Sequence, residues 1–270
     1  MSGEVMNEYT RRRVMEEERH QFIYGYNTEE RHRFLKDLES AYPILTDSTE
    51  PAAIYMKDFS LPLSKPTNKT INSENSRLIA SKFLDFSISE NIIRRILEQE
   101  KLNTSMSKIN DLLERINRLY GNRKHQQSRS LEELKSILAE SRKMYSNYYA
   151  EYLQGNQSYL DTDSLTIPFI NAIDVAAKTK QTLSIDSYYG LIFEQDERMP
   201  LVSYQAINGF VTRRCNGDLS IKVATTPDAW QTFYDLNGTL AEKIHDYGTV
   251  ELDDCVKQYT KKMKEIKESE

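Results

Sequence analysis

Short apolar runs that alternate with helical stretches constrain the fold of this chain more than any other feature. The expected strands are His20–Tyr24, Ala52–Met56, Tyr188–Phe193, Leu219–Thr225 and a last short one marked by Val250 and Leu252. The expected helices around them are Asn7–Arg19, a stretch from Glu29 onward, Tyr204–Arg214 and a closing helix Cys255–Lys267. Strands that alternate with helices build parallel sheets covered on both faces, so the pattern predicts an α/β fold.

A long stretch from Ser76 to about Gly155 has helical periodicity only. Capping boxes at Ser87 with Glu90 and at Ser130 with Glu133 indicate two helix starts within it. A loop rich in Pro, Asn, Ser and Thr precedes it, and after Tyr159 we expect strands again. The chain therefore reads as one domain: an N-terminal helix (1–19), an α/β core (20–75 and 160–270) and a helical insert (76–157).

Composition narrows the class of protein. The 270 residues are 39% hydrophobic, enough for a core, and 36 basic and 41 acidic residues give a net charge of -5 without a chain-wide basic surface. No run approaches the roughly 18 apolar residues of a membrane helix, so we expect a cytoplasmic protein. Cys215 and Cys255 form no CxxC or Cys/His pattern, so no metal site is expected.

A glycine-led segment follows the first strand, where a phosphate-binding loop would lie. In the motif G-x-x-x-x-G-K-[ST], amides at the helix start hold phosphates, the lysine reaches the terminal phosphates and the hydroxyl binds Mg²⁺. Residues 25–32 match this spacing but keep only Gly25. Glu30 replaces the second glycine, Arg31 the lysine and His32 the hydroxyl residue.

These replacements differ in their expected effects. Arg31 keeps a cation, although its planar fork is not equivalent to a lysine, and His32 offers no hydroxyl to magnesium. Glu30 adds a carboxylate toward the phosphates, and one like charge at about 4 Å costs about 4 kcal/mol at an effective dielectric of about 20. We expect low affinity for a triphosphate, which leaves ATP or ADP with Mg²⁺ open as a ligand and no cofactor assigned.

The strand Leu191–Phe193 ends in the acidic run Glu194-Gln195-Asp196-Glu197. In an ATPase such a strand ends in an acid that holds Mg²⁺, next to a glutamate that orients the attacking water. Glu194 can take the first role, but the amide of Gln195 cannot act as a base in the second. A register shifted by two residues, with Asp196 and Glu197 as the acidic pair, stays open.

With these motifs the chain resembles prokaryotic AAA+ ATPases related to origin-recognition proteins, whose second motif reads D-E-[YF]-E before a helix carrying Gln-x-x-[IV]-Asn. The matching residues are Glu194 to Glu197, then Gln205, Ile207 and Asn208, then the strand Ile221-Lys-Val-Ala224, and the segment His245 to Asp253. The resemblance spans Gln21 to about Glu265 and implies a parallel P-loop NTPase sheet, AAA+-like, with a large helical insert.

The resemblance also implies roles for residues outside the two motifs. Arg213 and Arg214 fall where an arginine finger reaches a neighbouring subunit's nucleotide, although a cationic helix end explains them equally well. Thr225 and Thr226 match the place of a polar sensor of the γ-phosphate. Such a protein works in an oligomer, with itself or with an ATPase paralogue.

We therefore expect a degenerate ATPase subunit that acts as a structural or regulatory partner in a multi-subunit complex, with antiphage defence and mobile elements among the candidate systems. One alternative is an active but divergent ATPase. Another is a helical adaptor or nucleic-acid-binding module that uses Arg11 to Arg13 and the lysines between Lys257 and Lys267, although both clusters are interleaved with Glu and favour a solvated helix face.

Overall fold

The computed structural model describes residues 2–25, 27–62, 74–103, 105–119, 128–154, 171–195, 199–213, 217–226 and 229–252. The strands are β1 (His20–Tyr24), β2 (Ala52–Tyr55), β3 (Tyr189–Glu194), β4 (Leu219–Thr225) and β5 (Tyr247–Glu251). The helices are α1 (Ser2–Met15), α2 (Thr28–Ala41), α3 (Glu74–Asn103), α4 (Met106–Leu119), α5 (Leu131–Leu153), α6 (Ala172–Leu183) and α7 (Leu201–Thr212).

The strands form one all-parallel sheet in the order β2-β3-β4-β1-β5. Successive residues face opposite sides, as the period of a strand requires. One face of the sheet contributes to an apolar cluster that includes Ile23, Ala53, Ile192 and Ala224. Phe22, the neighbour of Ile23 in β1, packs on the other face. Both faces are buried, which explains why each strand is an almost unbroken apolar run in sequence.

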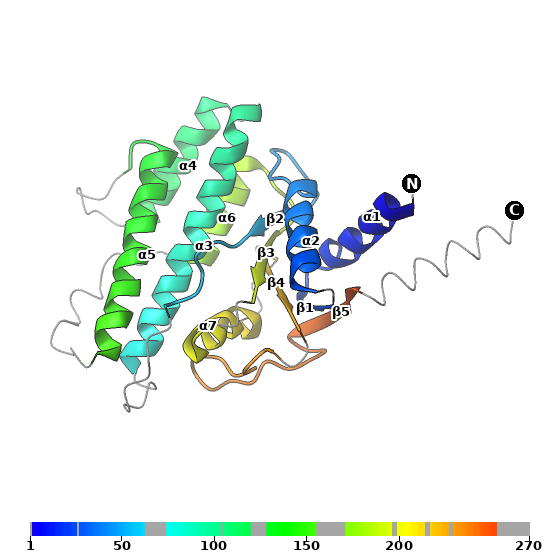
Figure 1. Ribbon diagram of the computed structural model, residues 1–270. Coiled ribbons are helices and arrows are strands. Elements are labelled where there is room, and N and C mark those ends of the chain that lie inside the picture. Colours follow the sequence, from blue (N-terminus) through cyan, green and yellow to red (C-terminus); the bar gives the residue numbers. More distant parts are fainter. Residues whose placement is uncertain are drawn as a thin grey trace, which may run out of the picture.

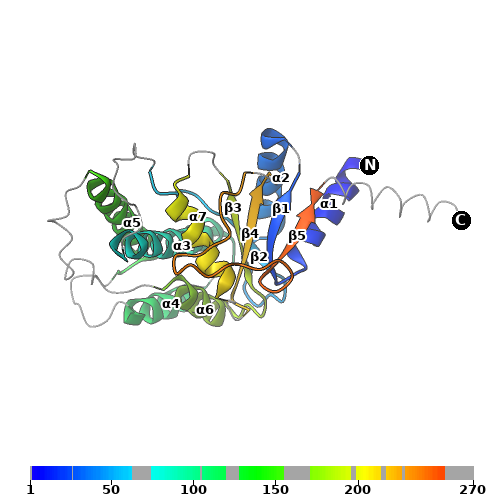
Figure 2. The same ribbon diagram turned by 90° about the horizontal axis from the view of Figure 1, so that it is seen from below.

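Helices cover both faces of this sheet. Figure 1 shows α1 and α2 on one side and α3 to α6 on the other, and Figure 2 shows the same separation in the turned view. Helix α1 approaches closely because β3 has a glycine below it: a Cβ on Gly190 would lie 2.8 Å from Cε of Met15. On the other face, α3 to α7 and the sheet share one apolar cluster.

The predicted α/β class is confirmed, and so are a strand at each of the five predicted places and helical structure in the described part of 76–155. Two expectations are wrong. Ser87 starts no helix, because α3 runs through it and its hydroxyl donates to Asp58 O at 3.2 Å. Helix α6 occupies a stretch where we expected strands to return; its buried residues Ala172, Val175, Ala176 and Thr179 repeat at helical spacing.

The capping box at Ser130 is confirmed, whereas the N-terminal helix has other bounds than predicted. Ser130 does cap α5, accepting from Glu133 N at 3.1 Å. The N-terminal helix ends at Met15 rather than at Arg19. The tyrosines of α5 pack inward, with Tyr145 and Tyr149 fully buried. The expected closing helix Cys255–Lys267 lies outside the described residues.

The outer edge of β2 is held by an ion pair between α2 and α3. Arg94 Nη2 donates to Glu39 Oε1 at 3.2 Å and to Tyr55 O at 3.1 Å, while Tyr55 N donates to Glu39 Oε1 at 3.0 Å. Ala53 N, further along the same edge, donates to Tyr42 O at 2.8 Å. This Glu39–Arg94 clamp fixes the backbone of Tyr55, whose side chain faces the site described next.

Candidate functional site

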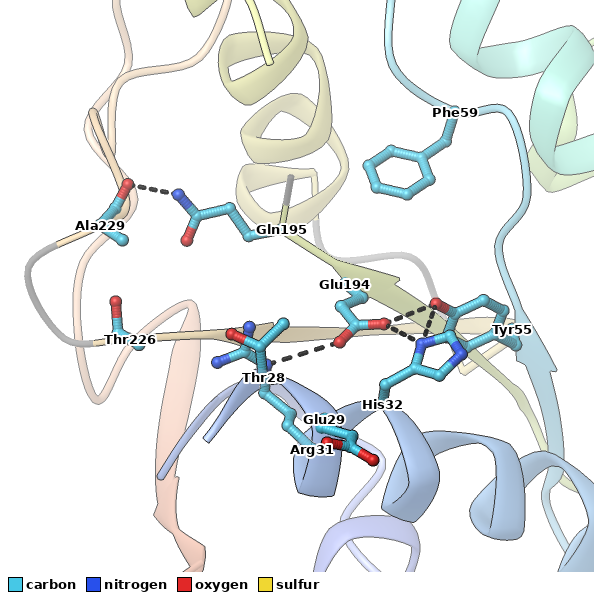
Figure 3. Close-up of a pocket in the computed structure, with 10 residues that line it drawn as sticks. All are labelled: Thr28, Glu29, Arg31, His32, Tyr55, Phe59, Glu194, Gln195, Thr226 and Ala229. Carbon is cyan, nitrogen blue, oxygen red and sulfur yellow. Dashed lines mark hydrogen bonds and ion pairs between the residues drawn. The ribbon is translucent and has the colours of Figure 1, made fainter. Parts of the chain in front are cut away.

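An open pocket of about 880 Å³ lies where the carboxyl ends of β1 to β4 meet. Strand β1 continues into α2 on one face and β3 into α7 on the other, and a pocket between such divergent connections is where open α/β sheets bind ligands. Figure 3 shows its lining. The lining residues are Thr28, Glu29, Arg31, His32, Tyr55, Phe59, Glu194, Gln195, Thr226 and Ala229.

The β1–α2 connection is shorter than a phosphate-binding loop. Since β1 ends at Tyr24 and α2 begins at Thr28, only residues 25–27 join them. Gly25 has φ 107°, a conformation that glycine adopts without strain, and Asn27 caps the helix by accepting from Glu30 N at 2.9 Å. One amide that could hold a phosphate is therefore already bonded within the chain.

Helix α2 then places its first turn along the pocket. Arg31 and His32 line it, as does Glu29, whereas the side chain of Glu30 is exposed and is not among the lining residues. Of the carboxylates in this turn, Glu29 is thus the one beside the pocket, and its side chain is 87% exposed. Water screens such a charge strongly, so the repulsion that the sequence predicted for an anion is weaker here.

Glu194, at the end of β3, is already engaged by three side chains. Its Oε2 accepts from Tyr55 Oη at 2.6 Å and lies 2.8 Å from His32 Nδ1, and its Oε1 lies 3.7 Å from Arg31 Nε. Because a carboxylate only accepts, His32 donates here through a protonated Nδ1. Burial, and then the hydrogen bond to Glu194, raise the pKa of Tyr55, which keeps its hydroxyl a donor.

Arg31 is the least satisfied polar group of the pocket. The residue is 4% exposed, yet its Nε and Nη1 are buried without a hydrogen-bond partner among the described residues, as is Oε1 of Glu194. Most buried polar atoms in proteins are paired, and each unpaired one costs about 1–3 kcal/mol. The contact at 3.7 Å is an ion pair without a hydrogen bond, so it leaves donor capacity unused.

Gln195 points away from Glu194, toward the segment after β4 (Figure 3). Its Nε2 donates to Ala229 O at 2.6 Å and to Tyr204 Oη at 3.1 Å, and its Oε1 accepts from the hydroxyl of Thr225. Both ends of the amide are thereby used. A glutamate here would face the carbonyl of Ala229 and could not donate to it, so this site is built around the amide.

Asn208, the last residue of the segment Gln205-Ala-Ile-Asn208, which has one residue fewer between Gln and Ile than the Gln-x-x-[IV]-Asn motif, is fully buried on α7. Its Nδ2 donates to Thr232 O at 2.8 Å and to Tyr234 O at 3.0 Å. These bonds hold the segment that follows β4 and that carries Ala229 over the pocket. In this structure Asn208 thus shapes one wall and does not line the pocket.

The structure brings together only part of the sequence-predicted site. Thr226 lines the pocket, and Thr225 is buried beneath it. Arg213 is exposed at the C-cap of α7 and is not among the lining residues. Asp196, Glu197 and Arg214 lie outside the described residues.

Sequence reasoning missed Thr28, Glu29, Tyr55, Phe59 and Ala229. Tyr55 had a usable signal, because it lies one residue before the end of the predicted strand Ala52–Met56, and the carboxyl ends of parallel strands share one edge of the sheet. Phe59 follows it and packs edge-on against Phe193, with the ring centroids 5.1 Å apart. No comparable signal marks Ala229, which takes part through its backbone carbonyl.

Comparisons with known proteins add no relative: no family model, no curated protein and no solved structure matches this chain. Within the described ranges, no cluster of three or more His, Cys, Asp and Glu side chains is placed to hold a metal ion. No described helix has both the length and the apolar character needed to cross a bilayer.

Proposed function

We propose that this chain is a catalytically degenerate AAA+-like subunit, which keeps the pocket of a P-loop ATPase but acts in the cytoplasm through protein partners. The observation that carries the proposal is the set of contacts made by Glu194, the last residue of β3, and by Gln195, which follows it. Glu194 is engaged by Tyr55, His32 and Arg31, and Gln195 is bonded at both ends of its amide. The amide of Gln195 cannot act as a base, and a metal ion at Glu194 would compete with Arg31 for Oε1 and with two donors for Oε2.

The placement of the other strand ends supports the same proposal. Strand β4 lies between β1 and β3, so Thr226 stands between the start of α2 and the acidic strand end. A polar sensor of a ligand would occupy such a place. The three-residue β1–α2 connection and the Asn27 cap argue against a phosphate cradle of backbone amides.

ATP turnover by the purified full-length chain with Mg²⁺ tests the proposal. We expect none above background, and we expect Gln195→Glu not to restore it, because the new carboxylate would face Ala229 O. The divergent-ATPase alternative predicts roughly 1–1,000 turnovers per second, lost in Glu197→Gln. Glu194→Gln is the matched control, since it removes a charge at the described strand end and should leave the background unchanged.

The partner role has its own test in the complex isolated from the native host. If Arg213 acts as a finger on a neighbouring ATPase, Arg213→Ala should lower the turnover of the complex by about 10³- to 10⁵-fold while the complex stays assembled. Unchanged turnover would leave the chain a scaffold. Salt-sensitive binding to DNA or RNA would instead favour the nucleic-acid alternative.

A further inference from the structure

A buried cation with unused hydrogen-bonding capacity lines the pocket. Arg31 belongs to the first turn of the 14-residue helix α2, is 4% exposed and lines the pocket, and its Nε and Nη1 lack hydrogen-bond partners among the described residues. A guanidinium is the side chain best suited to bind an oxyanion with two parallel N–H donors. The residue with the unused donors and the start of α2 therefore adjoin the same pocket.

The groups around Arg31 fit a phosphate more closely than a metal ion. The hydroxyl-bearing residues Thr28 and Thr226 line the same pocket, and both can donate to an oxyanion. Glu194 is the nearest carboxylate, but Tyr55 and His32 already donate to it. A cation such as Mg²⁺ would have to compete with Arg31 for that carboxylate.

The remaining space fits a small organic molecule behind the phosphate. The pocket volume of about 880 Å³ exceeds what a lone phosphate fills, and Phe59 forms an aromatic wall at its far side from α2 (Figure 3).

We propose that this pocket binds a phosphorylated small molecule directly on Arg31, without a metal ion. The metal independence of this binding rests on the proposed function, because both assume that Glu194 stays bonded to side chains of its own chain. The phosphate contacts Arg31, with Thr28 and Thr226 as further donors. Phosphate recognition thus depends on a side chain of α2 and not on a backbone loop.

Calorimetric titration of the full-length chain with phosphate, pyrophosphate and ADP, each at constant ionic strength, tests the proposal. We expect saturable binding in EDTA that added Mg²⁺ does not strengthen, and we expect acetate, a carboxylate probe, to bind more weakly. Charged hydrogen bonds of this kind correspond to roughly 10- to 100-fold in affinity. Arg31→Met should lose that factor, and Arg31→Lys should retain part of it.

Arg33→Met is the matched control, since it removes the same charge from the same helix at a side chain that is 71% exposed. It should change the affinity by less than about 3-fold, as expected for a screened surface charge. Circular dichroism and thermal unfolding verify that each variant is folded. If Arg31→Met does not fold, the affinities of Arg31→Lys and Arg33→Met are compared instead, and the proposal requires the larger loss in Arg31→Lys.

Absence of saturable binding by all three phosphate probes would overturn the inference, as would an equal loss in the Arg31 and Arg33 variants. Binding that requires Mg²⁺ would overturn it as well. These results are separable from the test of turnover. Binding without turnover supports both proposals. Turnover together with Arg31-dependent binding contradicts only the proposed function. If there is no binding and no turnover, only this inference is contradicted.

Discussion

Two buried cations lie near opposite ends of the same sheet, and their surroundings differ in one respect. Near the strand starts, Lys222 is fully buried and its Nζ donates to Glu17 O at 2.6 Å, Arg19 O at 2.9 Å and Gln21 Oε1 at 3.0 Å. Near the strand ends, Arg31 is almost as buried but leaves Nε and Nη1 without hydrogen-bond partners among the described residues.

The difference separates a cation that the chain itself satisfies from one that, in our proposal, binds a ligand. An ammonium has three donors, and Lys222 has three acceptors, all of them supplied by the chain, so nothing is left for a ligand. Its burial is nevertheless costly and lowers its pKa to about 7. Arg31 is almost as buried, yet two of its donors have no acceptor among the described residues, which favours a ligand-binding role.

The largest expected effect is at the satisfied cation. Lys222→Met should lower the free energy of unfolding by about 3 kcal/mol, because Gln21 Oε1 loses a donor and two backbone carbonyls lose one each. Urea unfolding measures it. A loss below about 1 kcal/mol would mean that the hydrogen bonds of Lys222 do not offset its desolvation, and the contrast with Arg31 would disappear.

The second effect is a pH dependence beside Lys222. Burial, and then the charge of Lys222, lower the pKa of His20 to about 4, consistent with Nδ1 accepting from Ile221 N at 2.9 Å. The unfolded chain binds this proton first, so stability is retained above pH 6.5 and falls by about 2 kcal/mol on acidification to about pH 4.5. His20→Asn, which keeps an acceptor, should flatten this part of the stability–pH curve; an unchanged curve would assign the loss to other groups.

A third effect concerns Gln195, the satisfied neighbour of the pocket. Gln195→Glu should cost about 2 kcal/mol in thermal or urea unfolding, because a carboxylate replaces the donor to Ala229 O. Gln195→Met, which loses the bonds without adding a charge, should cost less. A stabilised glutamate variant would indicate that the segment around Ala229 rearranges easily.

The smallest effect is expected at Arg31 itself. Arg31→Met should change the free energy of unfolding by no more than about 1 kcal/mol without ligand, because it removes buried donors that lack acceptors. The ion pair that it also removes is long, at 3.7 Å, and Glu194 keeps its contacts with Tyr55 and His32. Urea unfolding of this variant beside Lys222→Met gives the comparison directly. Equal losses would show that both cations are structural.

The sheet was predictable because a parallel strand buried on both faces is a contiguous apolar run, as in Phe22 to Tyr24. Helix α6 was not predictable, because its buried face consists largely of Ala and Thr. These residues repeat at helical spacing but give only a weak hydrophobic pattern in the sequence. A helix start at Ser87 was wrongly predicted because Ser87, which looks like a cap residue, lies within α3 and donates to a backbone carbonyl.

The site was half predictable. Motif spacing was enough to predict four of the residues that line the pocket, because a strand end followed by a helix is a local pattern. These residues are Arg31, His32, Glu194 and Gln195. Their mutual bonding was not predictable, because Tyr55 approaches Glu194 across 139 positions of sequence. Contacts at such separation depend on strand order, which a single sequence does not specify.

The Glu39–Arg94 clamp also bears on how the protein behaves in a crowded solution. An edge strand with free N–H and C=O groups recruits strands from other molecules and seeds aggregates. Along the outer edge of β2, Ala53 N, Tyr55 N and Tyr55 O are all bonded within the chain, two of them through charged side chains. An intruding strand would have to break a buried ion pair before it could dock, so the clamp makes this edge a poor nucleus for intermolecular β-structure.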